Sequence, residues 1–402
     1  KSKMSILKKM NAYNFEESKI SPYITEIFPK NISLNKKIQF FSSLPYTEHP
    51  FSKRNWGHNL HTLCSYQSKL KASMAYYLVQ TFSLQKQKIL DPFSGVGTIP
   101  FECCLNGRYG YGLDINPVAY HTTFAKVCRP AKNEVLKMVE KLGRYITTSK
   151  LTSKDVDDYT KNFYHKKTLD EILLARNFFN KNFEKFSKTP AFSFLLSCML
   201  HILHGNRPYA LSRRSHNLTP LAPRGPAIYK SVIDHVINKI NISYKDPIPQ
   251  RYLKGDTKIG SVFNIPYSKE HFDAIITSPP FWSSTRFYAN NRIRLWFCGW
   301  DYHTQEKRGR SEFVEERQIQ DISIYFDIFS QFYRVLKQDG ICVLHLGVIP
   351  GMDIGKTITP LAKKAGFKFI DLVYENTENI ERHGMKDQGI TKNQQFLILK
   401  KS

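Results

Sequence analysis

A stiff polar turn, Thr277-Ser278-Pro279-Pro280-Phe281, follows the apolar run 272–276. The run predicts a strand, and the prolines rigidify the turn because they fix φ and cannot donate a backbone hydrogen bond. An aromatic amine is a weak nucleophile because its lone pair is delocalised into the ring. The Ser278 hydroxyl and the Pro279 carbonyl could accept both amine hydrogens and aim the lone pair at an electrophile. The alternative is a plain proline turn after an edge strand.

Phe281 and a second segment complete the candidate chemistry. Phe281 offers a face on which an extruded base can stack, a contact worth about 1–3 kcal/mol per base. Upstream, the segment 91–98 follows a short apolar run and has glycines at 95 and 97, where the backbone can turn sharply and a ligand can approach closely. The segment matches neither a Walker loop nor a GxGxxG fingerprint. Taken alone, it is as consistent with a purely structural turn as with a ligand-binding loop.

Asp114 strengthens the interpretation of this glycine loop as a ligand-binding segment. It ends a predicted strand 23 positions after Asp91, close to the offset of about 20 residues at which a second Rossmann strand presents a carboxylate to ribose hydroxyls. Alone, an acid after a strand is more often a helix cap. Together, the loop and Asp114 favour an adenosine-containing cofactor lying over the strand ends.

The elements that must position these residues alternate between strand and helix. Strands are predicted at 88–90, 109–113, 272–276, 340–346, 367–374 and 395–399, and helices at 74–82, 98–106, 321–336 and 355–365. This alternation predicts an α/β fold, a doubly wound, mostly parallel Rossmann-like sheet with helices on both faces.

An insertion of about 120 residues interrupts the alternation. Helical patterns cover 135–147, 167–183, 191–204 and 227–240. We therefore expect an N-terminal arm (1–49), a catalytic core in two pieces (50–130 and 250–402) and a helical insertion (131–249), a candidate target-recognition region.

Charge and composition indicate a polyanionic partner. The 402 residues contain 59 Lys and Arg against 34 Asp and Glu, a net charge of +25 with a pI near 9.6. The alternative explanation for part of this excess is an AT-rich genome, which would enrich the chain in Lys. No CxxC pair, secretory signal or membrane span is visible, so a cytoplasmic protein without a metal site is expected.

Taken together, these motifs resemble the S-adenosylmethionine-dependent amino-methyltransferases of DNA, from residue 58 to the end. The loop matches that family's DPFxGxGT motif, the segment 112–117 its GxDINP motif, and Ser278 to Phe281 its S/D/N-PP-Y/F/W motif, with Phe where Tyr is commoner. The resemblance implies S-adenosylmethionine as cofactor, bound by Tyr66, Lys69, Asp91, Phe93, Gly95, Gly97, Thr98, Asp114, Ile115, Thr277 and, at the adenine amine, Asp256. Ser278, Pro279, Pro280 and Phe281 become the catalytic residues.

The serine form of the motif is similar to the cytosine-N4 branch, which implies methylation of a flipped cytosine in double-stranded DNA. Adenine-N6 methylation, methylation of an RNA base, and a non-catalytic DNA-binding module remain alternatives. Other stretches look like one bacterial clade. The resemblance leaves open a cognate restriction endonuclease as a partner in a restriction-modification system.

Arginines mark two candidate nucleic-acid contacts. From 185 to 233 the chain has no Asp or Glu, and a proline-rich loop there carries several arginines that suit phosphate clamping or guanine readout. The alternative is a solvated basic loop. A second group follows the catalytic turn. The expected contacts are Arg207, Arg213, Arg214, Arg224, Arg286 and Arg292.

Overall fold

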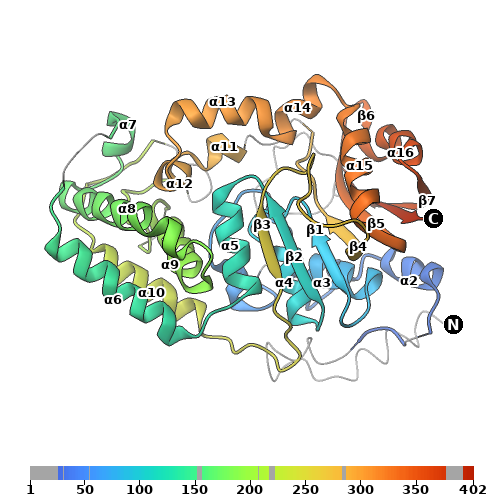
Figure 1. The fold of residues 1–402 in the computed structure, drawn as a ribbon, viewed down its shortest axis with the longest axis horizontal. Helices are drawn as coiled ribbons and strands as arrows, with labels where there is room; N and C mark the ends of the chain where they lie inside the picture. Colours follow the sequence, from blue (N-terminus) through green and yellow to red (C-terminus); the bar gives the residue numbers. More distant parts are fainter. Residues whose placement is uncertain are drawn as a thin grey trace.

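The computed structural model describes residues 26–29, 31–53, 55–151, 156–206, 208–216, 222–282, 287–376 and 393–402. One sheet runs through its centre (Figure 1), with the strand order β3-β2-β1-β4-β5-β8-β7 and β6 paired to β5 alone. The strands are β1 (Lys88–Asp91), β2 (Tyr109–Asp114), β3 (Asp256–Ile259), β4 (Phe272–Thr277), β5 (Leu336–Ile349), β6 (Met352–Asp353), β7 (Phe367–Asn376) and β8 (Asn393–Lys401).

The strands β3, β2, β1, β4 and β5 pair in parallel, and β8 runs antiparallel to both β5 and β7. Successive residues of each central strand serve opposite faces. Ile89 of β1 and Ile276 of β4 join one hydrophobic core, while Leu90 of β1 and Ile275 of β4 join a second core. Both faces of the sheet are therefore buried under helices, and the predicted doubly wound, mostly parallel fold is confirmed.

Helices of the core flank the sheet. α3 (Ala72–Phe82), α4 (Thr98–Leu105) and α5 (Pro117–Val127) contribute to the first core, and α15 (Ile324–Val335) and α16 (Ile354–Lys364) to the second. Helices α3, α4, α15 and α16 lie close to their predicted ranges, whereas α5 had no predicted range.

The insertion is helical, as its patterns predict. It consists of α6 (Lys132–Thr148), the short α7 (Asp158–Lys161), α8 (Lys166–Phe186), α9 (Pro190–Ile202) and α10 (Val232–Ser243). Helix α9 is buried along nearly its whole length, between α5 of the core and the helices α6 and α10 (Figure 1). The predicted start of the last helix at 227 is wrong, because the chain is non-helical until the Ser231 hydroxyl caps α10.

Two parts of the core escaped prediction. β3 is an edge strand of four residues without an apolar run. Among the described residues between β4 and α15 there are also four helices, namely α11 (Phe287–Asn290), α12 (Arg292–Phe297), α13 (Tyr302–Glu312) and α14 (Val314–Gln320). Trp296 and Phe297 are buried there.

The segment before residue 49 is packed against the core where it is described. Helix α2 (Leu34–Phe41) lies against α3, with short 3-10 turns following at Pro45–Thr47 and Asn59–Thr62. Glu26 accepts two hydrogen bonds from the fully buried Arg108 guanidinium, one of 2.7 Å to Oε2, and another of 2.7 Å from Arg251. The buried guanidinium of Arg108 in the core is thus paired with the carboxylate of Glu26.

Among the helices of the described residues, none is both long enough and apolar enough to cross a lipid bilayer.

Candidate functional site

The candidate site lies at the carboxyl ends of β1 and β4. The connections from β1 lead toward β2 on one side and, later, to β4 on the other. Open α/β sheets bind ligands at such a switch point, outside the carboxyl ends of the strands. Asp91 ends β1 and Thr277 ends β4, and the Thr277 hydroxyl donates a 2.6 Å hydrogen bond to Asp91 Oδ1. The two predicted motifs, 186 residues apart, are therefore in direct contact.

The glycine loop is held by Asp114. Gly95 and Gly97 have φ values of +49° and +71°, the left-handed region that favours glycine. A Cβ on Gly97 would lie 2.7 Å from the Thr123 side chain, so this position also needs glycine for space. The backbone N–H of Gly95 donates to Asp114 Oδ2 at 2.9 Å, and that of Asn116 donates to Asp114 Oδ1 at 2.9 Å.

The two site aspartates are buried carboxyl groups. Burial raises the pKa of Asp91 to about 7 and that of Asp114 to about 6, against hydrogen bonds that lower both. Each oxygen of Asp114 takes one backbone N–H and retains a lone pair for a ligand hydroxyl. Asp114 can therefore hold the loop and accept from ribose hydroxyls at the same time.

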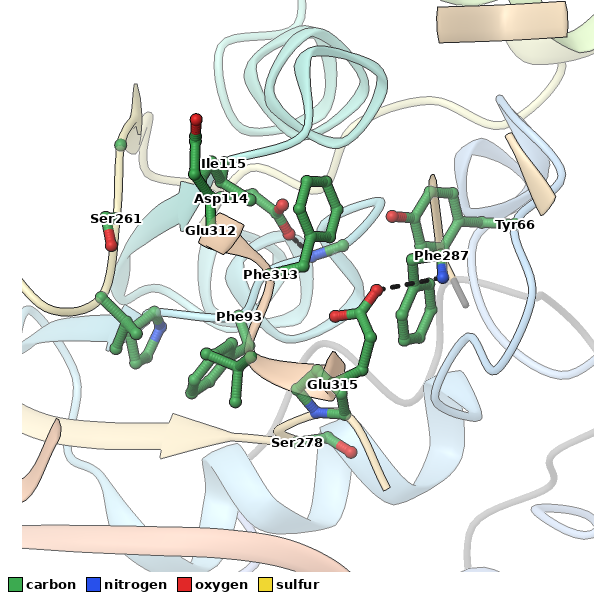
Figure 2. Close-up of a pocket in the computed structure, with 16 residues that line it drawn as sticks. Tyr66, Phe93, Asp114, Ile115, Ser261, Ser278, Phe287, Glu312, Phe313 and Glu315 are labelled. Atoms are coloured by element: carbon green, nitrogen blue, oxygen red, sulfur yellow. Dashed lines mark hydrogen bonds between the residues drawn. The ribbon is translucent and has the colours of Figure 1, made fainter. Parts of the chain in front are cut away.

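A cavity opens above these strand ends (Figure 2). The empty space between its walls, which includes space open to solvent, is about 570 Å³. Both predicted motifs contribute to its walls. The predicted site residues that line it are Tyr66, Phe93, Gly95, Asp114, Ile115, Ser278 and Pro280, joined by Pro92, Gly260, Ser261, Val262, Phe287, Glu312, Phe313, Val314 and Glu315.

Tyr66 forms one wall of the cavity. Its hydroxyl accepts a 3.1 Å hydrogen bond from Asn116 Nδ2, and its ring stacks on Phe287 with centroids 5.7 Å apart. Burial raises the pKa of the Tyr66 phenol far above its ordinary value, so the hydroxyl stays protonated.

The catalytic turn lies along the cavity. Ser278 and Pro280 line it, Pro279 is buried, and the half-buried Phe281 ring contacts His345 edge-on at 5.2 Å. From α14, Gln318 Nε2 donates a 3.1 Å hydrogen bond to the Pro280 carbonyl. The turn is therefore fixed from within by its prolines and from outside by a helix that sequence reasoning did not predict.

Glu315 of α14 is a site residue that was missed. It is only 4% exposed, and its Oε1 accepts a 3.0 Å hydrogen bond from the Phe287 backbone N–H. Figure 2 shows its carboxyl group within the cavity. Burial raises the pKa of Glu315 to about 8. No local motif marks this acid, because its neighbours 312 and 316 are also glutamates.

Asp256 does not line the cavity, so its contact with the adenine amine stays a prediction. It is the first residue of β3, and the cavity is lined instead by the residues that follow the strand, Gly260 to Val262. Tyr267 donates to the Asp256 carboxylate at 3.5 Å. Because β3 runs parallel to β2, its carboxyl end reaches the cavity and its first residue does not. Ser261 contributes a polar side chain to this part of the cavity wall.

Three other predicted donor-site residues support the cavity without lining it. Thr98 begins α4 and is buried behind the glycine loop, together with Gly97. Lys69 is exposed and donates from Nζ to the His61 carbonyl at 2.9 Å. These residues shape the loop and the chain before α3.

Some of the predicted arginines are exposed to solvent, and others bond to groups of the protein itself. Arg214 and Arg224 are exposed and joined by a backbone bridge, whereas Arg213 donates to the carbonyls of Gly225 and Asn162. Arg292 lies between the rings of Tyr159 and Tyr302 and pairs with Asp157 at 3.3 Å. Arg207 and Arg286 lie outside the described residues.

These residues fit S-adenosylmethionine by their chemistry. Asp114 is placed for ribose hydroxyls, the side chains of Phe93, Ile115 and Val262 offer apolar walls, and Gly95 leaves the backbone open to approach. Residues 61–172, which include the glycine loop and Asp114, match the UPF0020 family model, described as an RMKL-like methyltransferase domain. The matched segment is a methyltransferase domain, and S-adenosylmethionine is its methyl donor. The predicted cofactor is thereby confirmed.

Solved structures resemble this methyltransferase only distantly. A SAM-dependent methyltransferase from Methanosarcina mazei shares 10% identity over 81% of this chain and 96% of its own, with a TM-score of 0.34. TrmN from Thermus thermophilus shares 12% over 84% and 50%, with a TM-score of 0.29. A putative DNA modification methylase from the same organism shares 15% over 35% and 52%, with a TM-score of 0.21. No curated protein matches the chain.

Proposed function

We propose that this protein transfers the methyl group of S-adenosylmethionine to the exocyclic amine of a base in DNA, with cytosine N4 as the acceptor. The observation that carries the proposal is the shared cavity. Ser278 and Pro280 of the catalytic turn line the same space as Gly95 of the glycine loop and Asp114 at the end of β2. An amine bound at the turn therefore faces a donor bound at the loop.

The chain's contribution to the reaction is mainly positioning. The bound donor supplies an electrophilic methyl group on a positively charged sulfonium. Ser278 Oγ and the Pro279 carbonyl accept the two amine hydrogens, and Phe281 supports the flipped base by stacking. The amine lone pair forms the new N–C bond while the C–S bond breaks and its electrons return to sulfur. Holding the reactants in line contributes much of the rate. The methylated nitrogen then loses one proton to solvent water.

Glu315 supports the donor half of this proposal. The donor carries a sulfonium and an ammonium, and a nearly fully buried carboxylate attracts such charges more strongly than one in water. Glu315 presents an acid to the cavity beside Asp114. We assign Glu315 to the positive part of the donor, and binding then requires this carboxyl group to lose its proton.

Cytosine is the proposed base because of Ser278. The amide-like amine of cytosine needs acceptors, which a neutral hydroxyl can provide. The serine form is also the one that resembles the cytosine-N4 branch. Adenine N6 and an RNA base are the alternative acceptors within the same chemistry.

The proposed DNA surface is a groove in the insertion. It is lined by thirteen residues, with three arginines and one lysine and no Asp or Glu among them: Asn206, Pro208, Ser212, Arg213, Arg214, Ser215, His216, Ala222, Arg224, Gly225, Pro226, Ile228 and Lys230. The exposed Arg214 and Arg224 are the residues assigned to phosphates. Arg213 and Lys230, whose donors are occupied by carbonyls, stiffen the loop that carries them.

Product analysis tests the proposal directly. The protein is incubated with methyl-labelled donor and either genomic double-stranded DNA or total RNA, and the nucleic acid is then digested to nucleosides. Label is expected in N4-methyldeoxycytidine. Label in N6-methyladenine or only in RNA selects an alternative acceptor, and no label from any substrate supports the non-catalytic module. The Ser278→Ala variant should bind the donor normally and lose most turnover.

A further inference from the structure

A buried histidine contacts the catalytic serine from the strand behind it. His345 of β5 is 4% exposed, and its Nδ1 lies 3.1 Å from Ser278 Oγ. On its other side, Nε2 lies 2.9 Å from Gln394 Oε1 of β8. The ring stacks on Phe396 with centroids 4.9 Å apart and meets Phe281 edge-on.

The sheet register creates this arrangement. Thr277 pairs with Leu344, so Ser278 and His345 both lie one residue beyond that pair. His345 in turn pairs with Phe396 of the antiparallel strand β8, and Gln394 lies two residues from Phe396, on the same face. The hydrogen bonds thus run across three adjacent strands, from Gln394 through His345 to Ser278.

The chemistry of the three groups fixes the direction of the hydrogen bonds. The Gln394 carbonyl oxygen can only accept, so the proton of a neutral His345 ring is on Nε2. Nδ1 is then an acceptor, and its partner must donate. The Ser278 hydroxyl has one proton, and this proton points at His345, away from the amine.

We propose that His345 is a positioning residue that keeps Ser278 an acceptor, an inference that rests on the proposed function. A free serine hydroxyl could rotate and donate its proton to the amine lone pair, which would quench the nucleophile. With its proton held by Nδ1, Ser278 Oγ offers only lone pairs to the cavity. The amine can then only donate to Ser278, and its own lone pair stays available for the methyl group.

Two substitutions separate the hydrogen bond from the packing. His345→Phe keeps a ring between Phe281 and Phe396 but removes the acceptor, whereas His345→Asn places an oxygen near the position of Nδ1. At saturating donor and DNA, His345→Phe should slow methyl transfer by about tenfold or more, as expected for loss of one hydrogen bond. Donor Kd should stay unchanged, and His345→Asn should recover most of the rate.

A double-mutant cycle tests whether His345 acts through Ser278. In the Ser278→Ala background, His345→Phe should cause no further loss of rate. An equal loss in both backgrounds would mean a purely structural role and would overturn the inference, as would an unchanged rate in His345→Phe itself.

A nuclear magnetic resonance measurement decides the geometry without any nucleic acid. Long-range proton–nitrogen correlation of the histidine rings should show His345, assigned by its loss in His345→Asn, protonated on Nε2 only. Its Nδ1 resonance should move in Ser278→Ala. A proton on Nδ1, or an Nδ1 resonance that stays unchanged in Ser278→Ala, would contradict the inference. If the wild-type protein methylates no nucleic acid, the proposed function fails, while this spectrum still tests the hydrogen bond.

Discussion

Thr277 Oγ1 lies 2.6 Å from Asp91 Oδ1 and donates a buried hydrogen bond that joins the last residue of β4 to the last residue of β1. Asp91 Oδ1 also accepts a 3.2 Å bond from the Phe93 N–H. The donor loop and the catalytic turn therefore share one anchor, so a change at either residue is felt in both halves of the site.

Thr277→Val should destabilise the protein by about 1–3 kcal/mol, because the substitution removes the donor to a buried carboxyl group. Urea denaturation followed by circular dichroism measures this loss. Thr257→Val on β3 is a matched control. Within the described structure the buried Thr257 hydroxyl has no hydrogen-bond partner, so its loss should cost nothing. Equal effects of the two substitutions would refute the assignment.

Asp91→Asn should alter how stability depends on pH. The folded-state pKa of Asp91 is raised to about 7 from an ordinary value of 3.8. Between those values the folded protein holds a proton that the unfolded chain has lost, so Asp91 reduces stability progressively as pH rises through this window. The variant's stability relative to wild type should therefore increase from pH 5 to pH 7 and level off above it. Paired urea titrations measure the difference, and a flat difference would contradict the raised pKa.

Glu315→Gln should weaken donor binding and remove its pH dependence. With a raised pKa of about 8, Glu315 is protonated in the free protein at pH 6–7, and a cationic donor must displace that proton. Wild-type affinity should rise by up to about tenfold per pH unit below pH 8, as measured by calorimetry. Glu312 also lines the cavity but is paired with Arg308 at 2.8 Å. Glu312→Gln should keep the wild-type slope, and a Glu315→Gln variant that kept it would exclude this role.

Arg214→Ala and Arg224→Ala should each weaken DNA binding and leave donor affinity intact. For each lost phosphate contact, the slope of log affinity against log salt should fall by about 0.9. Fluorescence anisotropy at several salt concentrations gives both quantities. Arg310→Ala is the control, because Arg310 is also exposed but pairs with Glu306 one turn away at 2.8 Å. If all three variants had the same slope of log affinity against log salt, the groove would not be part of the DNA-binding surface.

The sequence predicted those elements and site residues that are marked by a short motif or by an apolar pattern along the chain. The strands around Ile89 and Ile276 have apolar runs, and the loop at Gly95 and the turn at Ser278 are motifs that the fold brings together as expected. The position of Asp256 outside the cavity wall could not be read from the sequence, because β3 has no apolar run that would show where the strand begins and ends.

Other site residues had no signal that could be read along the chain. Glu315 reaches the cavity through helices with an ordinary polar composition, and His345 meets Ser278 only because β4 and β5 pair in one register. Contacts between residues 67 positions apart depend on how the sheet assembles. The roles of Arg213 and Arg292, which bond to the protein itself, depend in the same way on tertiary neighbours.

The ion pair between Glu26 and Arg108 sets a practical limit on shortening the chain. A version trimmed to the core boundary at residue 50 would delete the carboxylate that faces a fully buried guanidinium, along with the helix that covers α3. An uncompensated buried charge costs several kcal/mol, a large fraction of the stability of a whole domain. Expression work should therefore keep residue 26, because the first part of the described chain covers the core and supplies the carboxylate that pairs with Arg108.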